Sequence, residues 1–185
     1  RLVAVAGLGD LGRSRVAPKL ATACSDQDTR VRRRAIIECG RVGDDRCVRA
    51  VAANLDSEDE AIRLAAADAL VAIGSEKALR TLLPAAKSGD TAVRKRAMEG
   101  IGALGSLQVL GTLLRGLDDE TAEIRQAAAA AIIRLVAEAP SDESHRVRET
   151  VAEQLTTYPN RDVVAEFLTL FADTDEAVIR RNTAW

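Results

Sequence analysis

The sequence predicts an all-α protein built from tandem two-helix repeats, and three observations support this fold class. Hydrophobic residues make up 47% of the chain but aromatic residues only 2%, so small and aliphatic side chains must form the core, as in closely packed helices rather than in sheets. A glycine recurs at intervals of 31 residues, at Gly12, Gly43, Gly74 and Gly105. An arginine recurs at the same interval, at Arg1, Arg32, Arg63, Arg94 and Arg125. A period of this length is typical of repeat architectures.

The second helix of each repeat carries the clearer pattern. In the repeat around Arg63, aliphatic residues and alanines recur three, four and seven positions apart over residues 61–73, which predicts an amphipathic helix there. Asp56, Ser57 and Asp59 precede it as candidate N-caps. Gly74 follows it as a glycine able to adopt the positive φ of a helix C-terminus.

Two further positions repeat with the arginines. The residue before the arginine is aliphatic: Val31, Ile62, Val93 and Ile124. The residue three after it is alanine: Ala35, Ala66, Ala97 and Ala128. We expect both to face the core, with the alanine allowing neighbouring helices to approach. The first helix is shorter, for example Arg46–Asn54, with Val48, Val51 and Leu55 facing inward.

The interval breaks after residue 139. Val136 stands where a glycine is expected, and Arg148 follows Arg125 by 23 residues. We therefore expect one solenoid over residues 1–185: regular repeats in 1–139, an irregular repeat without its first helix in 140–158, and a final partial repeat in 159–185. The irregular repeat is consistent with a bend, a contact surface or a tolerated deletion. Arg1 and Trp185 fall within predicted helices, so we expect a segment of a longer protein, truncated at both ends.

The aliphatic–arginine pair that opens each second helix and the aliphatic–glycine pair that closes it resemble the short HEAT-like repeats of phycobilisome lyase subunits. This resemblance covers essentially the whole chain. It implies a right-handed α-α superhelix, a HEAT-like solenoid, in which the second helices line the concave surface.

The outward positions of the second helices are the candidate site. They lie two, three and six residues after the core aliphatic residue, opposite or beside the core face. The predicted partner-binding residues are Arg33, Arg34, Ile37, Leu64, Asp68, Lys95, Arg96, Glu99 and Gln126. Two basic clusters separated by an apolar step favour an acidic peptide or protein helix as partner, although an ordinary solvated surface would show the same pattern. We therefore expect a non-catalytic protein–protein interaction scaffold.

Two alternatives stay open. The resemblance also implies a subunit of a bilin lyase or isomerase complex, which would need a reactive cysteine or an acid–base group in the groove. A nucleic-acid-binding segment would use Arg30, Arg32, Arg33, Arg34, Arg94, Lys95 and Arg96. The net charge of −2 argues against nucleic acid and against an anionic membrane.

Catalytic and metal chemistry find little support in the residue pattern. His145 is the single histidine, and Cys24, Cys39 and Cys47 lack the short paired spacing of zinc ligands. We expect buried free thiols, no catalytic residue, no metal and no cofactor. No apolar run is long enough to span a membrane, and we expect a cytoplasmic protein. The repeated arginines are expected to pair with loop aspartates and lock successive repeats together, rather than to bind a phosphate.

Overall fold

A computed structural model describes residues 13–103, 105–139 and 144–173 of the chain. Within these ranges all regular structure is helical, which confirms the predicted all-α class. The chain divides into two units, residues 1–100 and 101–185.

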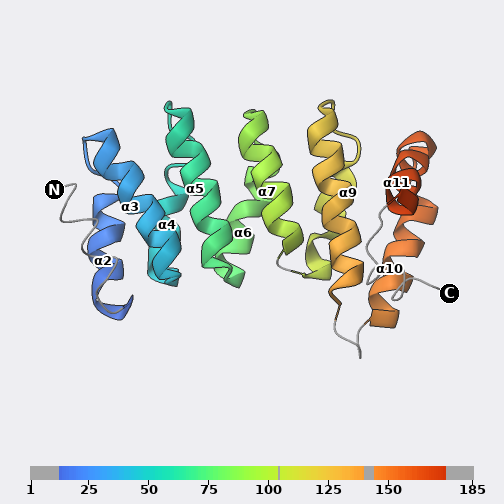
Figure 1. The fold of residues 1–185 in the computed structure, drawn as a ribbon, viewed down its shortest axis with the longest axis horizontal. Coiled ribbons are helices and arrows are strands. Elements are labelled where there is room, and N and C mark those ends of the chain that lie inside the picture. The colour runs from blue at the N-terminus through green and yellow to red at the C-terminus, as the bar shows by residue number, and fades with distance from the viewer. Residues whose placement is uncertain (1–12, 104, 140–143, 174–185) are drawn as a thin grey trace. The chain divides into compact units, whose positions relative to one another are not determined.

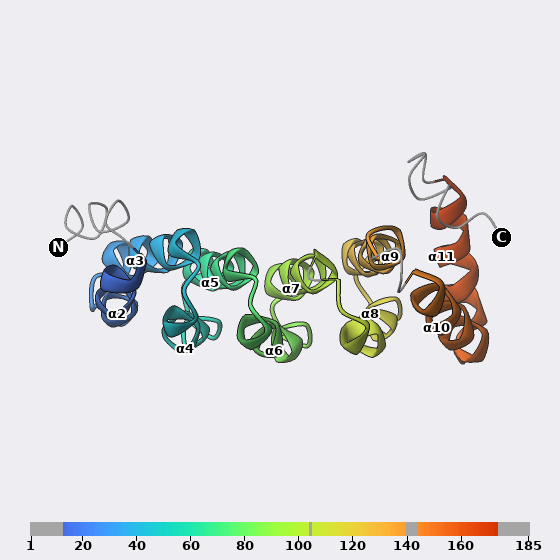
Figure 2. The ribbon, with the colours of Figure 1, turned by 90° about the horizontal axis from the view of Figure 1, so that it is seen from below.

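The first unit consists of two layers of helices. Its elements are α2 (Arg13–Ala23), α3 (Thr29–Val42), the 3-10 turn η1 (Asp45–Cys47), α4 (Val48–Ala52), α5 (Glu60–Ile73), α6 (Glu76–Ala85) and α7 (Thr91–Ala103), whose last residues enter the second unit (Figure 1). The second helices α3, α5 and α7 form one layer, and the first helices form the other (Figure 2). This alternation is the two-helix repeat that the sequence predicts.

The second unit begins with the same pairing and ends differently. Its elements are η2 (Leu107–Val109), α8 (Leu110–Gly116), α9 (Ala122–Ala137), α10 (Ser144–Thr157) and α11 (Arg161–Asp173). Both α10 and α11 pack against α9. Figure 2 views α9 along its axis but α11 from the side, so α11 crosses α9 steeply. The predicted limits of the irregular and final repeats fall partly outside the described residues, at 140–143 and 174–185, and stay predictions.

The second helices begin and end where their caps predict. Helix α5 spans Glu60–Ile73, close to the predicted 61–73, and the Asp59 carboxylate accepts hydrogen bonds from the N–H groups of Ala61 and Ile62. Gly74 ends the helix in the left-handed region, with φ of 65°. The same arrangement recurs at α3, which Asp28 caps and Gly43 terminates, again with φ of 65°.

The repeated apolar positions form the core, as predicted. The aliphatic residues before the repeated arginines are at most 3% exposed, and the four repeated alanines are fully buried. The first helix around Val48 differs from the prediction, because η1 and the short α4 replace one continuous helix over 46–54. Leu55, expected to face inward, is only half-buried. Asn54 is buried instead, and its amide donates to the backbone carbonyls of Cys24 and Ala50.

The repeated arginines bind backbone carbonyls of the preceding loop, a contact that was not predicted, and at Arg63 the predicted pairing with a loop aspartate is also present. Arg63 donates from Nη1 to the carbonyl oxygens of Ser57 and Glu58, at 2.7 and 3.0 Å. The same two contacts, six and five residues upstream, recur at Arg32, Arg94 and Arg125. Arg63 also pairs with the Asp90 carboxylate of the next repeat. These arginines hold the loop before each second helix, which is a structural role.

Successive second helices approach each other through a residue pair in which one member is glycine. The pairs are Gly40 with Ala69, Val71 with Gly100, and Gly102 with Ala131. A Cβ at these glycines would lie 2.9, 2.1 and 2.3 Å from the nearest atom of the partner. The three pairs occupy equivalent positions in the repeat. The first member lies nine residues after the core aliphatic residue of its own helix, and the second lies seven residues after the core aliphatic residue of the following second helix. Only a missing side chain allows such close packing.

Candidate functional site

The predicted binding residues of the first unit lie on the outward side of the second-helix layer. Arg33 and Lys95 are exposed, Leu64 is half-buried, and Ile37, at 37% exposure, is one of the most exposed large apolar residues among those described. Gln126 is exposed on α9 in the second unit. These predicted residues therefore lie on the outward faces of their helices. A binding role for them stays a prediction.

Four of these residues line one groove between α3 and α5, which we call the α3–α5 groove. Arg33 and Ile37 come from α3, and Leu64 and Asp68 come from α5. The volume is about 480 Å³. The other lining residues are Gly40, Arg41, Ala61, Ala65, Ala69 and Ala72. Because Gly40 and Ala69 bring the two helices into contact, small residues form the floor and longer side chains rise at the sides.

Arg34 is balanced by an internal carboxylate. Its Nη2 lies 2.6 Å from Oε1 of Glu38, whose side chain is only 2% exposed. Arg41 approaches the same oxygen at 3.5 Å. A buried carboxylate requires such charged neighbours, since an unpaired buried charge is costly. Arg34 therefore serves to compensate Glu38 and is not a free cation for a partner.

Arg96 is also paired with carboxylates of the protein itself. It forms ion pairs with Asp68 of α5 and with Glu99 one turn along α7, the latter at 2.9 Å. Hydrogen bonds to Glu99 and Asp68 raise the pKa of Arg96. Three of the predicted binding residues thus form one charge network between α5 and α7. Among the described residues of this face, Arg33 and Lys95 are left as cations without an ion-pair partner.

Several other basic residues are likewise engaged within the protein. Arg30 donates two hydrogen bonds to the Asp28 carboxylate, at 3.3 and 3.1 Å, and Arg32 and Arg94 bind loop carbonyls. Three of the seven residues expected to contact nucleic acid are therefore held by carboxylates, and two more hold loops. This face does not present the continuous basic stripe typical of nucleic-acid-binding surfaces.

The three cysteines cluster in space, which their sequence spacing did not predict. Cys24, Cys39 and Cys47 are free and buried, as expected, and the sulfur atoms of Cys24 and Cys39 lie 3.7 Å apart. Contact with the Cys24 and Cys47 thiols, together with burial, raises the pKa of Cys39. A protonated, buried thiol is a poor nucleophile. The Cys39 thiol thus belongs to the core rather than to a reactive site.

Metal-binding and membrane-spanning features were also sought. Over the ranges that the structure describes, no three histidine, cysteine or acidic residues are grouped as a metal site would require. In the same ranges, no helix has both the length and the apolar character needed to cross a membrane.

Comparison with known proteins identifies the repeat. Residues 48–134 match the HEAT repeat family model. A designed armadillo repeat protein is 17% identical, with a TM-score of 0.56, over 98% of this chain and 89% of its own. The complex of CpcE and CpcF of phycocyanin lyase from Nostoc sp. PCC7120 is 17% identical, with a TM-score of 0.54, over 97% and 86%. A comparison with curated protein sequences finds no match.

A second designed armadillo repeat protein, solved in complex with the peptide (KR)4, is 18% identical, with a TM-score of 0.51, over 91% of this chain and 90% of its own. At these identities the structural likeness establishes the fold alone: a helical repeat solenoid. The handedness of the superhelix stays a prediction. The HEAT repeat match over residues 48–134, the 31-residue period and the paired helices agree on a helical repeat solenoid of the HEAT-like type.

Proposed function

We propose that this chain is a non-catalytic scaffold that binds a partner protein or peptide on its second-helix layer, with the α3–α5 groove as the central contact. The observation that carries the proposal is the groove itself, in which exposed Ile37 and half-buried Leu64 lie beside the unpaired guanidinium of Arg33. Apolar surface with an arginine at its edge is the composition enriched at protein interfaces.

The known structures support this kind of function. One designed armadillo relative is described in complex with a peptide, and CpcE and CpcF are described as a complex with each other. Repeat proteins present rigid extended surfaces in which the variable positions select the partner. In this chain the variable positions are the outward residues of α3, α5 and α7.

The charges favour a partner segment that carries an apolar side chain and an acidic one. The apolar side chain would lie between Ile37 and Leu64, and the acidic one would reach Arg33 or Lys95. Arg34 contributes less, since its departure would leave the buried Glu38 carboxylate unpaired, and Arg96 contributes less because it already pairs with Asp68 and Glu99. The predicted acidic partner is therefore retained, with two contributing cations instead of four.

The test is selection of peptides from a random displayed library, followed by fluorescence anisotropy with the selected peptides. We expect enrichment of acidic–apolar sequences. Arg33→Glu and Leu64→Glu should each weaken binding at least tenfold. Arg49→Glu is the matched control, because Arg49 is exposed on α4, in the other layer of the same unit. If the selected peptides bind Arg33→Glu and Arg49→Glu equally, the groove assignment is wrong.

The likeness to a lyase complex supports one second candidate, a subunit that holds a bilin for attachment to a protein thiol. The chain's own thiols do not favour it, because all three are buried. Mixing the protein with bilin and recording the visible spectrum tests this alternative, and an unchanged spectrum would remove it.

A further inference from the structure

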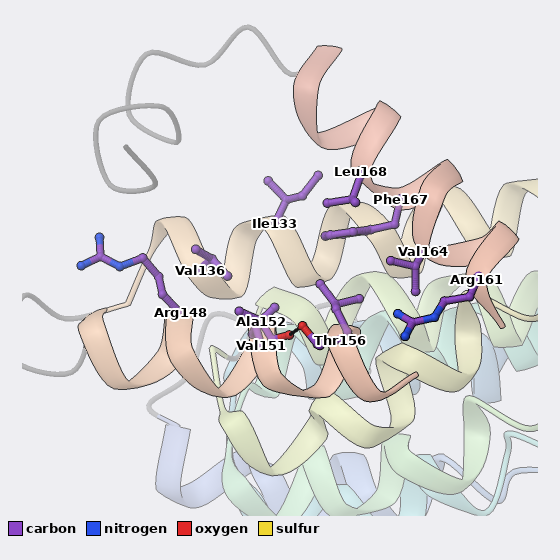
Figure 3. Close-up of a pocket in the computed structure, with 11 residues that line it drawn as sticks. Ile133, Val136, Arg148, Val151, Ala152, Thr156, Arg161, Val164, Phe167 and Leu168 are labelled. Carbon is purple, nitrogen blue, oxygen red and sulfur yellow. Dashed lines mark hydrogen bonds between the residues drawn. The ribbon is translucent and has the colours of Figure 1, made fainter. Parts of the chain in front are cut away.

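A second cavity lies in the second unit, apart from the groove of the proposed function. It occupies about 450 Å³ among α9, α10 and α11 (Figure 3). Eleven residues line it, and eight of them are alanine, valine, leucine, isoleucine or phenylalanine. Ile133 and Val136 of α9, Val151 and Leu155 of α10, and Phe167 of α11 are each less than 9% exposed. We call this the α9–α11 cavity.

The cavity has a cause in the sequence. Ile133 occupies the position that is Gly40 in α3 and Gly102 in α7, nine residues after the core aliphatic residue. Those glycines allow direct helix contact, whereas Ile133 faces the side chains of Phe167 and Leu168 (Figure 3). Bulky side chains on both helices, together with the steep crossing of α11, keep α9 and α11 apart and leave space between them.

Three polar residues line this apolar space. Figure 3 shows Arg148 at one end and Arg161 at the other, with Thr156 beside Ala152 and Val151. The Arg161 side chain is exposed and has no ion-pair or hydrogen-bond partner among the described residues. The Thr156 hydroxyl donates its hydrogen to the Ala152 carbonyl at 2.7 Å. Toward a ligand, the hydroxyl oxygen can therefore act only as an acceptor. An unpaired guanidinium beside apolar walls complements a carboxylate on an apolar body.

We propose that the α9–α11 cavity binds a small amphiphile with one carboxylate and a long apolar chain, the chemistry of a fatty acid. The apolar chain lies among the α9, α10 and α11 side chains, and the carboxylate pairs with Arg161. The volume falls within the range of about 300 to 1,000 Å³ that small-molecule sites occupy. An extended peptide fits less well, because its backbone N–H and C=O groups would face walls that offer no partners.

The experiment measures binding of oleate and of methyl oleate to the 185-residue protein by calorimetry, below the concentration at which either lipid aggregates. We expect oleate to bind at least tenfold more tightly than methyl oleate. Arg161→Glu should weaken oleate binding at least tenfold and leave methyl oleate unchanged. Arg134→Glu is the matched control, since Arg134 is exposed on α9 and does not line the cavity. Thermal unfolding verifies that each variant is folded.

The apolar contact is tested separately with Ala152→Trp, which places a large side chain in the cavity and should weaken both lipids at least tenfold. Four results would overturn the proposal. They are no saturable binding of oleate, equal effects of Arg161→Glu and Arg134→Glu, equal affinities for oleate and its ester, and binding that is insensitive to Ala152→Trp in the folded variant. The first result would mean that a partner's helix or another segment of this chain fills the cavity.

Discussion

The α3–α5 junction of the first unit and the α9–α11 junction of the second unit pack differently. At the first, Gly40 meets Ala69 and the helices touch, so the surface above them is a groove floored by small residues. At the second, Ile133 lies opposite the side chains of α11, and an apolar cavity that opens to solvent remains between the helices. The closed junction has a glycine on one of its two facing helices, whereas the α9–α11 junction has bulky side chains on both.

A large effect is expected from closing the space that a glycine provides. Gly102→Ala would place a Cβ 2.3 Å from the Ala131 Cβ and 2.7 Å from its Cα. Although alanine favours a helix by about 1 kcal/mol, overpacking costs about 1 to 3 kcal/mol. Because backbone must move here, we expect a net loss of about 2 kcal/mol in the free energy of unfolding, measured by urea denaturation.

Gly111→Ala is the matched control for that substitution. Gly111 also lies in a helix, but the nearest atom to an added Cβ is 4.0 Å away. This substitution should stabilise the protein by about 0.5 to 1 kcal/mol, since only the helix preference acts. Changes of the same sign at both glycines would refute the role of Gly102 in close packing.

A smaller effect is expected at Tyr158, which helps to hold the wall of the cavity formed by α10. The Tyr158 hydroxyl donates to the Leu114 carbonyl at 2.9 Å and contacts the Asp118 carboxylate, which also accepts from Asn160 at 2.8 Å. Tyr158→Phe removes these contacts and should lower the free energy of unfolding by about 1 kcal/mol. Urea denaturation measures it, and an unchanged midpoint would show that α10 is held by apolar packing alone.

The same residue predicts a modest pH dependence. Burial, and then the hydrogen bond to Asp118, raise the pKa of Tyr158 to about 12, from an ordinary value of 10.0. A raised pKa means that the folded state favours the neutral phenol. Its contribution to stability is therefore complete below about pH 10 and is lost as the pH rises through about 12. Between about pH 9 and about pH 12, the melting temperature of the unaltered protein should fall further than that of Tyr158→Phe. Parallel curves would contradict this assignment.

The sequence predicted those features that one repeat determines by itself. Asp59 and Gly74 set the limits of α5 because caps act locally, and Ile62 with Ala66 revealed the buried face through helical period. Features that need two repeats were missed. Gly102 lies inside a helix, where glycine is unfavourable, and its purpose is visible only opposite Ala131. The sequence also does not show that Glu38 neutralises Arg34.

The candidate site was predictable to the same extent. The outward positions of α3, α5 and α7 follow from helical geometry, whereas the charge network around Arg96 depends on the spacing between α5 and α7. The cysteine cluster could not be predicted from the sequence, because spacings of 15 and 8 residues match no ligand motif. The α9–α11 cavity depends on the direction of α11, which no local pattern specifies.

The most direct measurement of the difference between the two junctions compares two neighbouring isoleucines of α9. Ile132 is fully buried and does not line the cavity, whereas Ile133 is 6% exposed and lines it. Truncation of a packed isoleucine to alanine costs about 2 to 5 kcal/mol. In urea denaturation we expect about 4 kcal/mol for Ile132→Ala but only about 2 kcal/mol for Ile133→Ala, whose side chain borders the cavity and has fewer packing contacts to lose. Equal losses would mean that Ile133 is packed as tightly as Ile132 and that no cavity adjoins it.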